Sequence, residues 1–268
     1  MIKSPLNLLR RLLQNRYMIQ NMVVRDIRAR YVGSFLGLFW TLIHPLSQLV
    51  IYYFVFAVVL KVRLGPEFGG THFAVWLIAG LLPWMLFAEV VGRSPNALME
   101  QAGLIKKTVF PSEILPFCHL SAALVNHFIA LILLVTYISF FDAGLTARMS
   151  LLAPYLIFMG LFAVGLSWFL SSLNVFLRDV GQVLGVALQI WFYLTPVIYP
   201  QNAIPSKYLF WLKLNPMYHA VDGYRMALLG RVLPDTAGLL FLIASALSAF
   251  LIGGLLFKKL KPSFADVL

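Results

Sequence analysis

Hydrophobic residues are gathered along this chain in six long blocks, separated by shorter polar segments. Each block is close to the roughly 20 residues that cross the hydrocarbon core of a bilayer as a helix. The blocks cover residues 38–60, 73–91, 114–141, 151–176, 183–199 and 238–257. The pattern therefore predicts an all-α membrane protein with six transmembrane helices, short connections and no separate soluble domain.

The composition supports a membrane protein and excludes an ordinary soluble domain. Apolar residues make up 61% of the 268 residues and charged residues only 12%, whereas soluble domains are about half apolar and a quarter charged. A soluble chain could not bury this much apolar surface. We expect the net charge of +11 to serve topology and contact with anionic lipid, and not nucleic-acid binding.

A basic amphipathic segment precedes the first apolar block. Residues 5–29 place apolar side chains on one broad face of a helix and mostly polar side chains on the other. Such a helix lies in the membrane interface, and its length before the first apolar block argues against a signal peptide. It is either a simple anchor or a docking surface for a cytoplasmic partner. The charged residues at its end, which are the candidate interface residues, are Arg25, Asp26, Arg28 and Arg30.

Lysines and arginines are distributed unequally between the two sets of segments outside the spans. The set that contains both termini carries 14 of them, and the other set carries 7. Because basic segments are retained in the cytoplasm, we expect a multi-pass protein with both termini cytoplasmic. The expected divisions are an interface segment at 1–37, a six-span domain at 38–257 and a cytoplasmic tail at 258–268.

The loop at 92–113 is the longest connection between spans on the expected cytoplasmic side. Ser94 and Pro95 can start a short helix there, and Gly103 can end it. Apolar groups rimmed by charge suggest a protein contact, although these groups could equally fold back against the ends of the spans. The candidate contact residues are Leu104, Ile105, Lys106, Lys107 and Phe110, with Val109 beside them.

Prolines interrupt the chain after the fifth apolar block. Pro196 and Pro200 stand at its outer end, and residues 200–237 are half-apolar but too broken to span a membrane. Irregular backbone at membrane depth is tolerated only where protein or a water-filled cavity covers it. We therefore favour two short re-entrant or interfacial helices over an ordinary external loop, and we expect this segment to mark the outer end of a pathway.

The chain lacks the motifs of several enzyme classes. It has no phosphate-binding G-x-x-x-x-G-K-S/T loop, no nucleophile elbow and no HExxH, and Cys118 is its single cysteine. We expect no catalytic residue, no bound metal and no cofactor. The spans carry few ionisable groups, which disfavours proton- or sodium-coupled transport. Glu89 is an exception, and Arg93 at i+4 could pair with it.

Four segments resemble, in order and spacing, the membrane permease subunits of ABC polysaccharide exporters. They are residues 25–40 with His44-Pro45 following, 103–116, 174–180 and 215–225. The likeness covers essentially the whole chain. It is closer to the O-antigen exporters than to the capsule or teichoic acid branches of the family.

The resemblance implies an inner-membrane transporter without enzymatic activity of its own. Such subunits form homodimers, and each binds a cytoplasmic ABC ATPase that holds ATP and Mg. A coupling helix in the 92–113 loop would sit in a cleft of the ATPase, and short gate helices would lie in the segment at 200–237. The implied substrate is a lipid-linked polysaccharide, and membrane lipid surrounds the protein. Two other classes remain open, a membrane-embedded transferase acting on lipid-linked sugars and a non-catalytic scaffold.

Aromatic residues are enriched near the fifth block and occur in the first. Aromatic rings can stack on sugar rings without fixing one register, which would let a glycan slide. The alternative is that these side chains are membrane-interface anchors or helix contacts. The candidate substrate-path residues are Tyr52, Tyr53, Trp191, Tyr193 and Tyr199.

Overall fold

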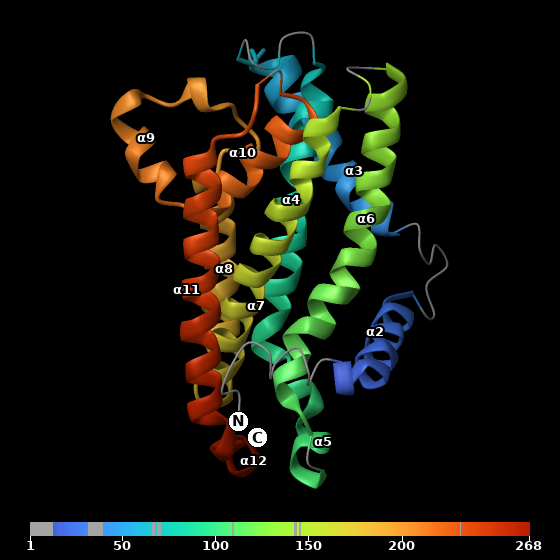
Figure 1. Ribbon diagram of the computed structural model, residues 1–268, viewed down its shortest axis with the longest axis vertical. Coiled ribbons are helices and arrows are strands. Elements are labelled where there is room, and N and C mark those ends of the chain that lie inside the picture. The colour runs from blue at the N-terminus through green and yellow to red at the C-terminus, as the bar shows by residue number, and fades with distance from the viewer. Residues whose placement is uncertain are drawn as a thin grey trace.

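The computed structural model describes residues 13–31, 40–65, 68, 71–108, 110–141, 144, 146–230 and 232–268. The described residues form helices joined by short connections, with no β-strand among them. The expected all-α class is therefore confirmed. The long helices run side by side along the long axis of the molecule (Figure 1).

Four long helices correspond to four of the six expected spans. They are α4 (Phe73–Arg93), α6 (Leu115–Phe141), α7 (Leu152–Phe176) and α11 (Thr236–Leu260). With their helical extensions, each is long and apolar enough to cross a membrane. The expected second, third, fourth and sixth spans are thereby confirmed as apolar helices of sufficient length.

The other two expected spans are shorter helices. The first contains α3 (Trp40–Tyr52), which continues into a π-helical segment at Tyr53–Val59. The fifth contains α8 (Val180–Leu194), which has 15 residues. At 1.5 Å per residue, α8 spans about 22 Å, less than the roughly 30 Å of a hydrocarbon core. The six-span count therefore stays a prediction.

Helix α4 lies at the centre of the bundle, and it packs against α6, α7 and α8. Its buried side chains include Trp76, Trp84 and Phe87, which belong to the main hydrophobic core. Because α4 is covered on several sides, its sequence is apolar all round and has no polar stripe. The other long helices expose more of their surface.

Helices α7 and α11 approach so closely that their backbones touch. A Cβ on Gly253 would lie 2.0 Å from the Gly165 carbonyl oxygen, and a Cβ on Gly165 would lie 2.4 Å from the Ala249 carbonyl carbon. Only glycine fits at these two positions without a shift of the backbone. Small residues at such crossings allow the close packing on which helix association in membranes depends.

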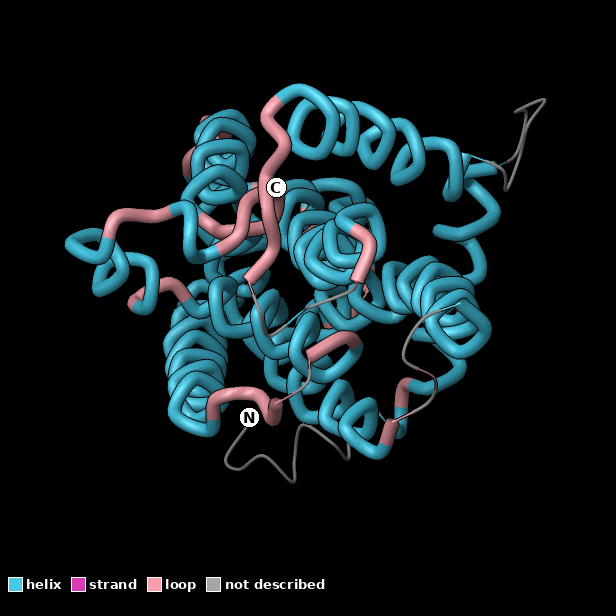
Figure 2. The backbone as a smooth tube through the Cα atoms, turned by 90° about the horizontal axis from the view of Figure 1, so that it is seen from above, coloured by secondary structure: helices cyan, strands magenta, loops and turns pink. Residues whose placement is uncertain are grey.

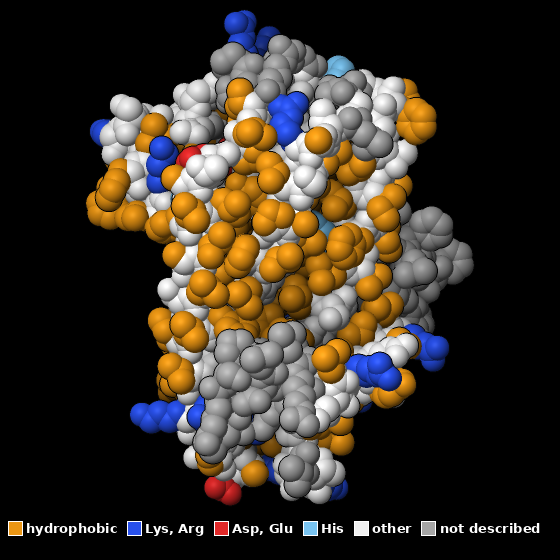
Figure 3. Space-filling model, viewed as in Figure 1, with side chains coloured by type: hydrophobic (Ala, Val, Ile, Leu, Met, Phe, Trp, Pro, Cys, Tyr) orange, Lys and Arg blue, Asp and Glu red, His pale blue; other side chains and the backbone are white. Residues whose placement is uncertain are grey.

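The two ends of the bundle carry different short elements. The end here called the α5 end carries α2 (Arg16–Tyr31), α5 (Ala102–Lys107) and α12 (Phe264–Val267). The α9 end carries α9 (Ser206–Lys213) and α10 (Pro216–Leu228). Helix α9 stands outside the bundle both from the side and from above (Figures 1 and 2). Between the ends, a broad hydrophobic band crosses the visible face, with lysines and arginines beyond it (Figure 3).

The structure refines three of the expected short elements. Helix α2 begins at Arg16, and residues 5–12 of the expected amphipathic helix lie outside the described part of the chain. Two short helices, α9 and α10, form within residues 200–237 as expected, whereas their re-entry into the membrane stays a prediction. Gly103 does not end the loop helix. It lies inside α5 without a positive φ, so the helix continues to Lys107.

Candidate functional site

Helix α5 forms the projecting tip of the α5 end (Figure 1). Its approach is made by 3₁₀ turns at Ser94–Asn96 and Met99–Gln101. Ser94 does not cap a new helix as expected, because its hydroxyl donates to the Val91 carbonyl of α4 and the first turn continues directly from α4. At the tip, Leu104 is 41% exposed, and Lys106 and Lys107 are exposed beside it. An exposed leucine flanked by lysines is a suitable anchor for another protein.

The other apolar residues of the loop fold back toward the bundle. Ile105 and Phe110 are partly buried against a hydrophobic cluster, and Val109 lies outside the described residues. Ile105 and Phe110 thus follow the fold-back reading, whereas contact of the exposed Leu104 with another protein stays a prediction. The cluster consists of Ala97, Leu98, Leu115, Val164, Trp168, Val175, Phe257 and Phe264. It joins the loop to α7, α11 and α12.

Polar contacts fix both ends of this loop to the long helices. The Asn174 side-chain amide on α7 donates to the Pro95 carbonyl at 2.9 Å. The Trp168 indole donates to the Glu113 carbonyl at 3.1 Å, and the Glu113 carboxylate forms an ion pair with Lys261. The backbone between these anchor points carries α5. The loop is therefore attached to the bundle on both sides of α5.

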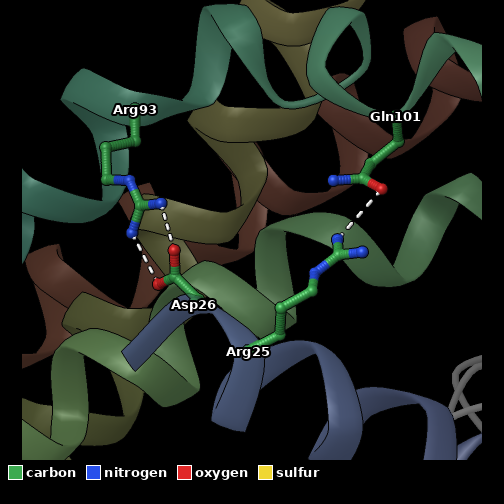
Figure 4. Close-up of polar contacts among 4 residues, drawn as sticks. All are labelled: Arg25, Asp26, Arg93 and Gln101. Carbon is green, nitrogen blue, oxygen red and sulfur yellow. Dashed lines mark hydrogen bonds and ion pairs between the residues drawn. The ribbon is translucent and has the colours of Figure 1, made fainter. Parts of the chain in front are cut away.

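Helix α2 is attached to the same loop by two polar contacts (Figure 4). Arg93, the last residue of α4, donates from its two terminal nitrogens to the Asp26 carboxylate at 2.5 and 2.8 Å. Arg25 donates to the Gln101 side-chain oxygen at 3.1 Å. The candidate interface residues Arg25 and Asp26 thus connect α2 to the α5 loop, whereas Arg28 is exposed. The Arg30 side chain lies outside the described residues.

At the α9 end, a buried arginine binds the backbone that the prolines leave unpaired. Helix α8 ends at Leu194, just before Pro196. Arg225 of α10 is 3% exposed and donates to the carbonyls of Pro196, at 2.6 Å, and of Val197. It also donates to the Trp76 carbonyl at 3.3 Å, and its guanidinium lies 3.5 Å from the centre of the Trp76 ring. Carbonyls and a π face together compensate the buried charge.

Sequence reasoning missed this role of Arg225. A Cβ on Gly80 would lie 2.2 Å from the guanidinium, so α4 leaves the space that the arginine fills. Two signals were present in the sequence, the proline-broken end of the fifth block and an arginine within the segment at 215–225. The sequence did not show that the two features meet in space, because Arg225 follows Val197 by 28 residues.

Asn215 organises the turn that leads into α10. Its side-chain oxygen accepts from the Met217 backbone N–H at 3.0 Å, which caps α10, and from the Trp191 indole at 2.8 Å. Its amide nitrogen donates to the Thr195 hydroxyl at 2.8 Å. The side chain therefore ties α10 to the end of α8. All these donors and acceptors are used within the fold.

The candidate substrate-path residues divide into three groups. Trp191 packs edge-on against Phe87, at 5.2 Å between ring centres, and is partly buried against the core. Tyr52 stacks on Phe192 at 5.8 Å, and the same ring meets the exposed Tyr193 at 5.3 Å. The remaining two residues are Tyr199, whose hydroxyl donates to the Tyr193 carbonyl, and Tyr53, which lines a separate apolar cavity between α3, α4 and α6.

Two ionisable side chains on α10 are neutral at pH 7. Burial lowers the pKa of His219, although the Lys213 carbonyl and the Asp235 carboxylate partly oppose this. Burial raises the pKa of Tyr218 above its usual value, and the negative charges of Asp222 and Asp235 raise it further. Both shifts favour the uncharged forms. The α9 end therefore presents neutral hydrogen-bonding groups beside two carboxylates.

Comparison with known sequences identifies the family of this chain. The family described as ABC-2 type transporter matches residues 17–229. The chain belongs to the ABC-2 type transporter family. It is 29% identical over 263 residues to the O-antigen export system permease protein RfbA of Myxococcus xanthus, covering 97% of this chain and 99% of that one.

Two further relatives are similar to this chain over most of their length. An O-antigen export system permease protein RfbA of Klebsiella pneumoniae is 30% identical over 248 residues, which cover 91% of this chain and 92% of that protein. The polysialic acid transport protein KpsM of Escherichia coli is 22% identical over 242 residues, with 90% and 92% of the two chains covered. The resemblance to polysaccharide exporter permeases drawn from the sequence segments is thus confirmed.

Proposed function

We propose that this chain is the membrane permease of an ATP-driven exporter that moves a lipid-linked polysaccharide, most closely O-antigen, across the inner membrane. The observation that carries the proposal is the near-complete match in length to O-antigen export permeases at 29–30% identity. The lower identity to a polysialic acid transport protein makes export of a capsule polysaccharide the second candidate.

In this proposal the α5 end faces the cytoplasm and binds the ABC ATPase. Leu104 enters a pocket of the ATPase, and Lys106 and Lys107 lie at the rim of the contact. The ATPase holds ATP and Mg, and this chain binds neither. Closure of the ATPase would displace α5, and the hydrophobic cluster beneath α5 would pass that displacement to α7 and α11. The contacts of α2 with Arg93 and Gln101 support a docking role for α2 beyond that of a simple anchor.

The α9 end would form the exit of the pathway on the other side of the membrane. A homodimer supplies the second wall of the pathway, since closed two-fold pairs are the commonest assemblies of identical subunits. Apolar residues of α8, among them Val186, Ile190 and Tyr193, are exposed in the single chain and are available for this seam. Tyr193 is the path residue that we place at the seam. Trp191 would support it from behind.

ATP-dependent transport in proteoliposomes tests the proposal. The chain and its partner ATPase are reconstituted together, and lipid-linked O-antigen or capsule glycan is supplied on the ATPase side. We expect O-antigen to appear on the opposite side with ATP and not with a non-hydrolysable analogue. Mass measurement of the complex should give two copies of each subunit. Preferential movement of the capsule glycan would favour the second candidate, and movement of neither glycan would refute export.

Tyr193→Ala tests the path assignment in the same assay. Because the side chain is exposed and the only contact described for its ring is with Phe192, we expect a folded complex with normal basal ATP hydrolysis and several-fold slower export. Tyr208→Ala, an exposed tyrosine on α9, is the matched control. Equal export by both variants would return Tyr193 to the role of a membrane anchor.

A further inference from the structure

A small polar cavity lies at the α9 end, where four segments of the chain converge. Its volume is about 160 Å³, and most of its walls come from the start of α7, the end of α9, one face of α10 and the first turn of α11, with Gln201 of a 3₁₀ turn completing them. Pockets that hold drug-sized molecules usually measure ~300–1,000 Å³. The cavity is therefore matched to a ligand of one small ring and not to an oligosaccharide.

Two glycines shape this cavity. A Cβ on Gly223 would lie 2.1 Å from the ring of Tyr155, and a Cβ on Gly238 would lie 2.6 Å from Nδ1 of His219. Any larger residue would push these rings out of position. The glycines thus allow a tyrosine and a histidine to lie flat against neighbouring helices at the wall of a polar space.

Most polar groups of the wall are held by the fold. Tyr218 donates its hydroxyl hydrogen to the Gln201 side chain at 2.6 Å, and Nε2 of His219 is 2.7 Å from the Lys213 carbonyl. Asp235 caps α11 by accepting from the backbone N–H groups of Ala237 and Gly238 at 3.1 and 3.3 Å. These bonds fix the wall before any ligand arrives, which lowers the entropic cost of binding.

Tyr155 is the exception in this wall. Its side chain lines the cavity and is 2% exposed, yet its hydroxyl makes no hydrogen bond with any residue that the structure describes. The Tyr155 hydroxyl is not one of the fully buried polar atoms that lack a partner, so it faces the space of the cavity, where a ligand can take its hydrogen bond in place of water. The hydroxyl lies near the two carboxylates, Asp222 and Asp235, that line the same space.

The residue types specify the chemistry of that ligand. Carboxylates and a tyrosine hydroxyl bind vicinal hydroxyl groups, and tyrosine rings pack against the C–H face of a pyranose. A metal ion fits less well, because the described residues contain no group of three or more metal-ligating side chains. Burial lowers the pKa of His219, and the charged side chains among the described residues of the wall are Asp222, Asp235 and Lys213, which favours a neutral ligand over a strongly anionic one.

We propose that this cavity binds one neutral pyranose unit of the glycan as it leaves the exporter. The inference rests on the proposed function for the identity of the glycan, but sugar binding itself can be measured without transport. Each wall contact is a single hydrogen bond or ring face, so the sugar unit is held weakly and released as the chain advances.

Saturation-transfer NMR with methyl pyranosides tests the site. The full chain is placed in phosphatidylethanolamine and phosphatidylglycerol nanodiscs, because maltoside detergents are themselves sugars. We expect saturable binding of at least one of the methyl glycosides of mannose, glucose, galactose and rhamnose, and none of glycerol. Tyr155→Phe should weaken binding about three- to tenfold, the loss of one hydrogen bond, without lowering the melting temperature. Tyr208→Phe, which removes an exposed hydroxyl at the same end, should leave binding unchanged.

A photoactivatable methyl pyranoside locates the site in the wild-type protein. Its adducts should fall on peptides that contain residues 153–157 or 216–223. Absence of saturable binding, equal binding by Tyr155→Phe and wild type, adducts elsewhere, or loss of binding on chelation of metals would each overturn the proposal. Export without sugar binding would remove the subsite and leave the proposed function standing. Sugar binding without ATP-dependent export would refute the proposed function and support the sugar site.

Discussion

Arg225 at the α9 end and Arg93 at the α5 end both bridge segments far apart in the sequence, but their surroundings differ. Arg225 is buried among three carbonyl oxygens and the Trp76 ring. The side chains of Arg93 and Asp26 are 31% and 22% exposed. A buried cation cannot exchange its partners for water, whereas a part-exposed pair can. We therefore expect the α9 end to keep one conformation, and we expect the contact of α2 with the α5 loop to break and re-form more easily.

Replacement of Arg225 should produce the largest effect. Arg225→Lys keeps the charge but cannot reach three carbonyls and stack on Trp76 at once, because an ammonium lacks the planar fork of a guanidinium. We expect a loss of roughly 3 kcal/mol in the free energy of unfolding, measured from tryptophan fluorescence in a mild detergent. Arg178→Lys, at an exposed loop position, is the control. A melting temperature equal to that of wild type would show that the α9 end does not depend on this contact.

Leu104→Asp should have the next largest effect, and it acts on assembly instead of folding. Leu104 is exposed, so its replacement should leave the melting temperature within error, while ATPase binding weakens by at least about tenfold, as for a central interface residue. Co-purification and surface-based binding measurements give this value. Ile105→Asp is the matched comparison, since Ile105 packs on the hydrophobic cluster. It should lower both stability and ATPase binding. Full binding by Leu104→Asp would exclude α5 as the contact.

Trp191→Phe tests how much the hydrogen bond between Trp191 and Asn215 stabilises the α9 end. The change keeps an aromatic ring between α4 and α7 but removes the hydrogen bond to Asn215. We expect a loss of about 1 kcal/mol in stability, with Asn215→Ala costing at least as much because it also removes the cap of α10. Additive losses in the double variant would contradict the contact, since two residues that share one bond should show coupling.

The pair formed by Asp26 and Arg93 should give the smallest change in stability. A double-mutant cycle with Asp26→Asn and Arg93→Gln is expected to yield a coupling of about 0–1 kcal/mol, weaker in high salt. The same variants should alter the ATP hydrolysis of the complex more than they alter its melting temperature. A coupling as large as the loss in Arg225→Lys would mean that the α5 end is as fixed as the α9 end.

Much of the fold could be read from the sequence because the bilayer imposes a simple rule. A helix that crosses hydrocarbon needs a long apolar block, and four such blocks appear as α4, α6, α7 and α11. The cap at Ser94 did not form, because the Ser94 hydroxyl donates back to the Val91 carbonyl and α4 continues into the 3₁₀ turn that contains Pro95. The end of α5 was not predictable either, since Gly103 permits a helix end without requiring one.

Only the tertiary structure decided which side chains meet across long sequence separations. The sequence shows that Leu104 and Ile105 are both apolar. Only the packing shows that Leu104 protrudes and that Ile105 is partly covered. Trp191 and Tyr193 stand two residues apart in an aromatic run, yet one packs against the core and the other is exposed. The apolar blocks and the proline break are local properties, fixed by the amino acids themselves. The closure of that break by Arg225, and the cavity that Tyr155 lines, arise only when α10 packs against α4 and α7.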